Sequence, residues 1–200
     1  MFWDNVSGIY DVFEDVYNGD VNRQVALKVA SCVQSDDIVL ELACGTGMIT
    51  KCVAPACKKI VATDFSVGML KKTEENCLGL KNVVLRKADI TNINCKDETF
   101  DKVIAGNVIH LLDDAHKAVS EMFRVCKRGG LVIIPTYINK DENGGQNLLT
   151  QIVGKAGADF KRQFTLESYK QFFEDEGYTD GEYTMFDGRV PCAVAVLKKP

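Results

Sequence analysis

Short apolar stretches alternate with amphipathic stretches along this chain. The apolar stretches predict strands over residues 38–42, 59–63, 83–85, 100–105 and 131–136. The amphipathic stretches predict helices over residues 22–33, from the turn after the first strand to about 54, from 66 to about 78, 115–125 and 166–176. Pro55, Gly79 and Gly177 follow three of these helices, and both residue types commonly end a helix.

This alternation predicts an α/β protein with right-handed crossovers and an open, doubly wound sheet that binds ligands at the carboxyl ends of its strands. The last apolar segments, 183–186 and 193–197, flank the sequence Asp-Gly-Arg-Val-Pro and predict a hairpin. We therefore expect a mostly parallel seven-stranded sheet with an antiparallel strand supplied by the C-terminal hairpin.

The composition narrows the class of partner. The 200 residues suit one domain, and 46% hydrophobic content is ample for a sizeable core. The net charge is -4, the pI is near 5.3, and the lysines are scattered in pairs, so no basic stripe is present to bind a nucleic acid backbone. We therefore expect no nucleic acid partner.

The sequence also bears on location and on metal binding. The N-terminus has no signal-peptide pattern and no apolar run reaches membrane-spanning length, so we expect a cytoplasmic protein without a membrane span. Eight cysteines are present, without a C-x-x-C pair and without metal-like spacing to His110 or His116. We expect free thiols and no metal site.

A glycine-rich turn follows the first predicted strand, in the sequence VLELACGTGMIT over residues 39–50. Ala43, Gly45 and Gly47 would let the backbone turn sharply beneath a ligand, and the N-H groups of the next helix would point at that ligand. This signal alone is weak, because dinucleotide-binding enzymes place G-x-G-x-x-G at the same point. In this chain the third glycine position is Thr50.

Polar side chains at the ends of four successive predicted strands strengthen the interpretation. Glu41, Asp64, Asp89 and Asn107 all occupy such positions. Unrelated surface residues would have no reason to recur at corresponding points of four strands, so we expect these side chains to share one ligand site.

The sequence from Glu41 to Gly47, ELACGTG, resembles the first motif of class I S-adenosylmethionine (SAM)-dependent methyltransferases, an acid followed by small-x-Gly-x-Gly. Ala43 replaces a frequent glycine of that motif. The start of the chain, WDNVSGIYD over residues 3–11, is similar to that of many small-molecule methyltransferases, including the ubiquinone and menaquinone branch. The resemblance implies a Rossmann-like fold, SAM as cofactor, S-adenosylhomocysteine (SAH) as product and a small-molecule methyl acceptor.

Site residues follow from this resemblance. Glu41 and the backbone from Ala43 through Gly45 to Gly47 would hold the methionine end of SAM, and Asp64 would accept hydrogen bonds from the ribose hydroxyls. The remaining residues would contact the adenine ring and the cofactor's amino group: Phe65 and Met69 on the ring faces, Asp89 and the Ile90 N-H at its edge, and the Asn107 carbonyl at the amino group.

Methyl transfer is an in-line displacement that depends on positioning and on the exclusion of water. His110, just past the fourth strand, is the candidate general base, with packing as the alternative. Tyr10 or Trp3 of an N-terminal aromatic helix could cover the sulfonium through a cation-π contact. Tyr137 could touch the acceptor or pack in the core.

These assignments divide the 200 residues into a helical lid at 1–37, a cofactor-binding core at 38–138, an insertion at 139–165, and a helix with hairpin at 166–200, all within one domain. An NAD-dependent oxidoreductase and a non-catalytic SAM-binding regulatory protein remain as alternatives. The missing third glycine and the terminal hairpin count against the former. The sequence leaves the acceptor, and the choice between monomer and homodimer, open.

Overall fold

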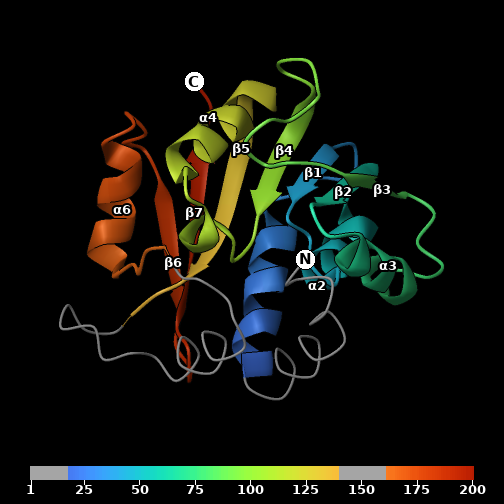
Figure 1. The fold of residues 1–200 in the computed structure, drawn as a ribbon, viewed down its shortest axis with the longest axis horizontal. Helices are drawn as coiled ribbons and strands as arrows, with labels where there is room; N and C mark the ends of the chain where they lie inside the picture. Colours follow the sequence, from blue (N-terminus) through green and yellow to red (C-terminus); the bar gives the residue numbers. More distant parts are fainter. Residues whose placement is uncertain (1–17, 140–160) are drawn as a thin grey trace.

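Seven strands form one sheet in the computed structural model, which describes residues 18–139 and 161–200 (Figure 1). The strands run in the order β3-β2-β1-β4-β5-β7-β6. They are β1 (Ile38–Leu42), β2 (Lys59–Asp64), β3 (Val83–Lys87), β4 (Phe100–Ala105), β5 (Cys126–Tyr137), β6 (Glu182–Phe186) and β7 (Cys192–Lys198). Strands β1 to β5 are parallel, and β7 pairs antiparallel with both β5 and β6. The predicted fold class and terminal hairpin are confirmed.

Helices connect the parallel strands as the sequence predicts. Besides a helix over residues 18–31, they are α2 (Met48–Val53), α3 (Val67–Asn76), α4 (Ala115–Val125), α6 (Leu166–Glu174) and the short 3-10 helices η1 (Ala54–Ala56) and η2 (Ile109–Leu111). Ser66 caps α3 by accepting the Met69 N-H at 3.1 Å. Proline in the first turn of η1 ends α2, because proline offers no N-H for a continuing helix.

Two apolar cores cover the two faces of the sheet. In β5, Val132 and Ile134 pack on the side of α4 and α6, whereas Ile133 between them packs on the side of the 18–31 helix and α2. Side chains of a strand point alternately to opposite faces, so a strand buried on both faces reads as a continuous apolar run. This double coverage explains why the strands could be recognised from their apolar stretches.

Strand β5 begins earlier than predicted. The sequence predicts a strand that begins at residue 131, yet residues 127–130, Lys-Arg-Gly-Gly, already lie within β5. The pairing with β4 jumps from Phe100↔Cys126 to Lys102↔Leu131, so residues 127–130 form a bulge within the strand. A Cβ at Gly130 would lie 2.6 Å from the Asp101 carbonyl oxygen, which explains why glycine occupies this close approach.

Two predicted segments fall outside the described residues. The aromatic helix that would carry Trp3 and Tyr10, and most of the predicted insertion at 139–165, lie in the ranges 1–17 and 140–160. The helix predicted to begin at residue 22 is already present at residue 18. Within the described ranges, no helix has the length and apolar character needed to cross a membrane.

Candidate active site

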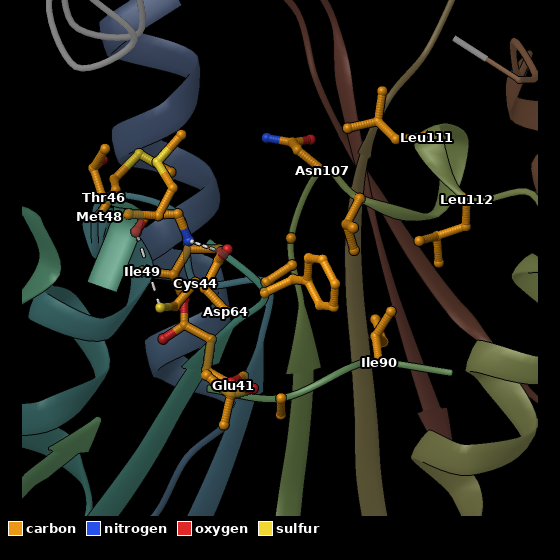
Figure 2. A pocket seen from close by; sticks show the side chains of 18 of the residues that line it. Glu41, Cys44, Thr46, Met48, Ile49, Asp64, Ile90, Asn107, Leu111 and Leu112 are labelled. Atoms are coloured by element: carbon orange, nitrogen blue, oxygen red, sulfur yellow. Dashed lines mark hydrogen bonds between the residues drawn. The ribbon is translucent and has the colours of Figure 1, made fainter. Parts of the chain in front are cut away.

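A cavity of about 370 Å³ lies at the carboxyl ends of β1, β2 and β4 and beside the loop after β3 (Figure 2). Every residue predicted to bind the cofactor lines this cavity except Gly47. Its volume is within the range of about 300 to 1,000 Å³ that is typical of small-molecule sites. The structure therefore brings together the strand-end residues that the sequence singled out.

The glycine-rich turn enters the cavity with three residues in the left-handed region. The φ angles are +51° at Ala43, +57° at Gly45 and +91° at Gly47. A Cβ at Gly45 would meet no atom within 4 Å, and Gly45 lines the cavity, so this glycine leaves open space there. Ala43 adopts a conformation that costs a residue with a Cβ about 1 to 2 kcal/mol.

Gly47 has a packing role that the sequence does not predict. It is absent from the cavity lining, and a Cβ there would lie 2.8 Å from Cγ2 of Thr73 on α3. The same threonine donates its hydroxyl to the Gly45 carbonyl at 2.8 Å. Gly47 therefore permits the close approach of α2 and α3, which supports the turn from behind.

Asp64, at the end of β2, is held by the backbone on both carboxylate oxygens. Its Oδ2 accepts the Gly45 N-H at 2.9 Å, and its Oδ1 accepts the Ser66 N-H at 2.8 Å. These two bonds tie the glycine-rich turn to the β2 end and fix the plane of the carboxylate. Each carboxylate oxygen has two lone pairs, so this geometry is compatible with further donors from a bound ligand.

Glu41, at the end of β1, is 2% exposed and lines the floor of the cavity. Its Oε2 accepts the Thr50 hydroxyl at 2.6 Å. Burial, reinforced by the nearby charge of Asp64, raises the pKa of Glu41 to about 8. The side chain is therefore largely protonated near neutral pH, and a cation placed beside it would favour its ionised form.

Phe65 and Met69 both line the cavity. Phe65 is 50% exposed, and the Lys87 ammonium lies 5.2 Å from its ring centroid. Met69, in the first turn of α3, is buried. An exposed aromatic ring and a buried thioether on one cavity suit a flat, apolar ligand group.

Asp89 and Ile90 form the part of the cavity that follows β3. Asp89 is exposed, and its Oδ1 accepts both the N-H and the hydroxyl of Thr91, at 2.8 and 2.7 Å. These bonds hold the carboxylate within a tight turn. Ile90 is buried and contributes apolar surface to the cavity.

Asn107 begins the opposite side of the cavity, at the end of β4. Its φ is +51°, an uncommon value for a residue with a side chain, and its N-H donates to the Pro135 carbonyl at 2.8 Å. Figure 2 shows Asn107, Leu111 and Leu112 across the cavity from Glu41, Cys44 and Asp64. The acids thus face a mostly apolar side.

His110 lies behind this apolar side. It is 4% exposed and is not among the residues that line the cavity. Burial lowers the pKa of its imidazole to about 4. This placement does not suit the catalytic base that the sequence predicts, because an effective base needs contact with the acceptor and a pKa near the working pH.

Tyr137, for which acceptor contact and core packing were both open, is absent from the cavity lining, and its ring centroid lies 5.9 Å from that of His110, which favours packing. Tyr10, the other predicted catalytic residue, lies outside the described residues. Cys44 does line the cavity, but burial raises the pKa of its thiol well above the ordinary value, so the reactive thiolate is disfavoured.

Several cavity residues were not singled out from the sequence. They are small or apolar residues of the two motif segments, and they include Thr46, Met48, Ile49, Gly106, Val108, Leu111 and Leu112. The segments themselves, residues 39–50 and 106–112, were marked by the glycine turn and by a polar residue at a strand end. The sequence does not indicate which way these side chains point, because an apolar residue next to a motif can either pack in the core or face a ligand.

Comparisons with known proteins bear on the family and the fold of this chain. Residues 40–134 match the family model described as a methyltransferase domain. The demethylmenaquinone methyltransferase of Paenarthrobacter aurescens is 29% identical over an alignment 218 positions long, which covers 99% of this chain and 85% of the relative. The phosphatidylethanolamine N-methyltransferase of Cereibacter sphaeroides is 35% identical over 107 residues, which cover 52% of each chain. The chain therefore spans only about half of that second relative.

Among solved structures, a SAM-dependent methyltransferase from Thermotoga maritima superimposes with a TM-score of 0.74 at 19% identity. The superposition covers 100% of this chain and 98% of that one, and at this identity it supports the fold alone. The family match covers β1 to β5, the segment that builds the cavity. Because this match is to a methyltransferase domain, it favours the methyltransferase interpretation over the NAD-dependent oxidoreductase. Residues 40–134 of this chain therefore form a methyltransferase domain, whose sequence is similar to the quinone-biosynthesis branch and whose fold is that of a solved SAM-dependent methyltransferase.

Proposed function

We propose that the cavity binds SAM along the ends of β3, β2, β1 and β4, and that the protein transfers the cofactor's methyl group to a small, largely apolar acceptor. One observation carries this proposal. Glu41, Asp64, Asp89 and Asn107 come from four adjacent strand ends and line a single cavity. Acidic groups on one side and apolar groups on the other suit a cofactor that combines a cation, a ribose and a flat base.

The residues fit the parts of SAM in order along the sheet. Asp64 would accept the ribose hydroxyls, because its carboxylate is fixed by Gly45 and Ser66. Glu41 would ionise beside the α-ammonium group, where its raised pKa would fall. The ring of Phe65 would stack on the adenine, with Met69 as the buried counterpart. Gly45 would leave room for the ligand where a Cβ meets no protein atom.

Bound SAM supplies a methyl group that is already activated by a sulfonium sulfur, so the protein mainly has to orient the acceptor and exclude water. An electron pair of the acceptor, from the π electrons of a hydroquinone ring or the lone pair of an amine, forms the new bond to the methyl carbon while the carbon-sulfur bond breaks. The sulfur keeps the electron pair of that bond as the neutral thioether of SAH, and the methylated acceptor then loses its C-H or N-H proton to water. Leu111 and Leu112 lie across the cavity from the acidic residues, and Val108 also lines the cavity, so these apolar side chains would exclude water from the acceptor.

The acceptor has to be a nucleophile, because the transferred methyl group is an electrophile. Described residues of the cavity lining include no cationic side chain that would hold an anionic acceptor. Of the acceptors named for the two relatives, demethylmenaquinone would need reduction to its hydroquinone before its ring could attack, whereas phosphatidylethanolamine offers an amine. The near full-length match to the first relative favours the reduced quinone.

The test is transfer of a radiolabelled methyl group from SAM to reduced demethylmenaquinone, with phosphatidylethanolamine vesicles in parallel. We expect label in the quinone alone. Label in the phospholipid would replace the proposed acceptor, and label in neither, with tight SAH binding retained, would favour the non-catalytic SAM-binding alternative. The variant Asp64→Asn is the matched control, because it should lose transfer together with SAH affinity.

A further inference from the structure

The apolar side of the cavity is built by a short and intrinsically weak segment. Val108, Leu111 and Leu112, here called the acceptor wall, lie around η2 between β4 and α4. In the proposed function this wall faces the acceptor, and the present inference rests on that function. Its position therefore matters for acceptor binding and much less for the cofactor, which lies across the cavity.

Little within η2 itself holds the wall. The helix has three residues, its N-cap Val108 makes no side-chain capping bond, and the Leu111 N-H donates to the Val108 carbonyl at 2.9 Å. A single 3-10 turn of this kind has poor hydrogen-bond geometry and little stability of its own. Contacts with the rest of the fold must hold it.

His110 supplies such contacts in two directions. Its Nδ1 lies 3.1 Å from the Thr136 hydroxyl near the end of β5, and both residues are buried. Its carbonyl accepts the backbone N-H groups of Lys161 at 3.0 Å and of Arg162 at 3.3 Å. One residue thus joins the wall to β5 and to the chain that leads into α6.

The chemical state of His110 agrees with a structural bond. Burial lowers the pKa of the imidazole to about 4, so the ring is neutral near pH 7 and can pair with a hydroxyl at either nitrogen. Ile109, beside it, is fully buried in the core under α4. The buried side chains of Ile109 and His110 fix the position of η2 against the sheet. Val108 and Leu111, on either side of this pair in the sequence, line the cavity.

We propose that His110 is a positioning residue, which through its contact with Thr136 holds the acceptor wall at the distance that the methyl acceptor requires. It does not exchange a proton with the acceptor. A general base would instead act on the reacting atoms, and the two roles predict different behaviour for conservative substitutions.

Two pairs of variants separate these roles. His110→Asn keeps an amide group close to the place of Nδ1, whereas His110→Leu removes the polar group. Thr136→Ser keeps the hydroxyl, whereas Thr136→Val removes it and keeps the shape of the side chain. The Thr136 pair is the matched control, because a general base at His110 would not require the Thr136 hydroxyl. If His110→Leu does not fold, Thr136→Val still tests the proposal.

For transfer to reduced demethylmenaquinone, we expect His110→Leu and Thr136→Val each to raise the acceptor KM about tenfold, as loss of about 1.4 kcal/mol would. The SAH affinity should stay within twofold, kcat within threefold and the pH profile unchanged. His110→Asn and Thr136→Ser should rescue the KM. The double variant His110→Leu with Thr136→Val should be no worse than either single variant, because both remove the same contact.

Hydrogen exchange gives a second readout that needs no acceptor. Amides of residues 108–112 and 161–162 should exchange faster in His110→Leu and Thr136→Val, and at the wild-type rate in the two conservative variants. Failure of the proposed function would appear as lost SAH binding or absent transfer in the wild type, with this exchange pattern intact. The positioning role is overturned if exchange is unchanged in His110→Leu, or if His110→Asn loses kcat as His110→Leu does while Thr136→Val keeps a normal KM.

Discussion

Replacement of Asp64 by asparagine tests the placement of the cofactor ribose. The substitution keeps the size of the side chain and removes one of the two anionic oxygens. In the free protein those oxygens accept the N-H groups of Gly45 and Ser66 at 2.9 and 2.8 Å. The asparagine amide can accept from only one of them, so the variant loses one charged hydrogen bond in the loop and the carboxylate that would receive the ribose.

The size of the effect follows from these bonds. A hydrogen bond to a charged group contributes about 1.5 to 3 kcal/mol. Since about 1.4 kcal/mol corresponds to tenfold in affinity, SAH should bind roughly 10- to 100-fold more weakly to Asp64→Asn. The unpaired N-H should also lower the free energy of unfolding, by about 1 to 3 kcal/mol.

Calorimetric titration with SAH measures the affinity, and urea unfolding measures the stability on the same samples. Asp36→Asn, at an exposed acid of the loop before β1, is the matched control for the loss of one negative charge. It should change neither quantity appreciably. A folded Asp64→Asn variant whose SAH affinity stays within twofold of wild type would refute the assignment of the ribose to Asp64.

Three further predictions concern stability. The pKa of Glu41 is raised from 4.5 to about 8 in the folded protein, so its contribution is fully present below pH 4.5 and is lost as the pH rises through 8; Glu41→Gln should flatten this decline in urea unfolding at pH 5 to 9, and an unaltered slope would contradict the buried neutral state. Ala43→Gly should stabilise the protein by about 0.5 to 1 kcal/mol by removing strain at a φ of +51°, whereas Ala30→Gly in the 18–31 helix should cost about 1 kcal/mol; equal losses would contradict the strain. Gly47→Ala should lower stability by about 2 kcal/mol or more, and Thr73→Ser, which removes the methyl group 2.8 Å from the new Cβ, should recover part of that loss; no recovery would refute the steric cause.

Much of the fold could be predicted because burial on both faces leaves a strong local signal. The predicted bounds 100–105 and 115–125 are those of β4 and α4, where a doubly covered strand and an amphipathic helix have distinct patterns. The predicted start of β5 was wrong, because residues 127–130 are basic residues and glycines and carry no apolar strand signal. Only the register against β4 reveals that they form a bulge inside the strand.

Site residues at strand ends could be predicted from the sequence. Site residues whose role depends on contacts between separate elements could not. Asp64 and Asn107 could be placed because parallel strands bring their carboxyl ends to one edge. The contact of Gly47 with Thr73 joins two helices, and the burial of His110 depends on β5 and the chain before α6. No pattern within residues 39–50 or 106–112 records those neighbours.

The protonation state of Glu41 is a similar case. Its sequence motif indicates an acid near the cofactor, but its raised pKa arises from complete burial and from Asp64, which lies on the neighbouring strand. An account of cofactor binding that treats this side chain as a fixed negative charge would therefore predict the wrong pH dependence.

Calorimetric titration of the wild-type protein with SAH, and in parallel with NAD, decides whether the cavity holds the methyl donor. We expect micromolar binding of SAH and no measurable binding of NAD, since the cavity joins the acids of β1 and β2 to an apolar wall and the glycine-rich turn is followed by Thr50 in place of a third glycine. Binding of NAD with no binding of SAH would contradict the assignment of the cavity to the methyl donor.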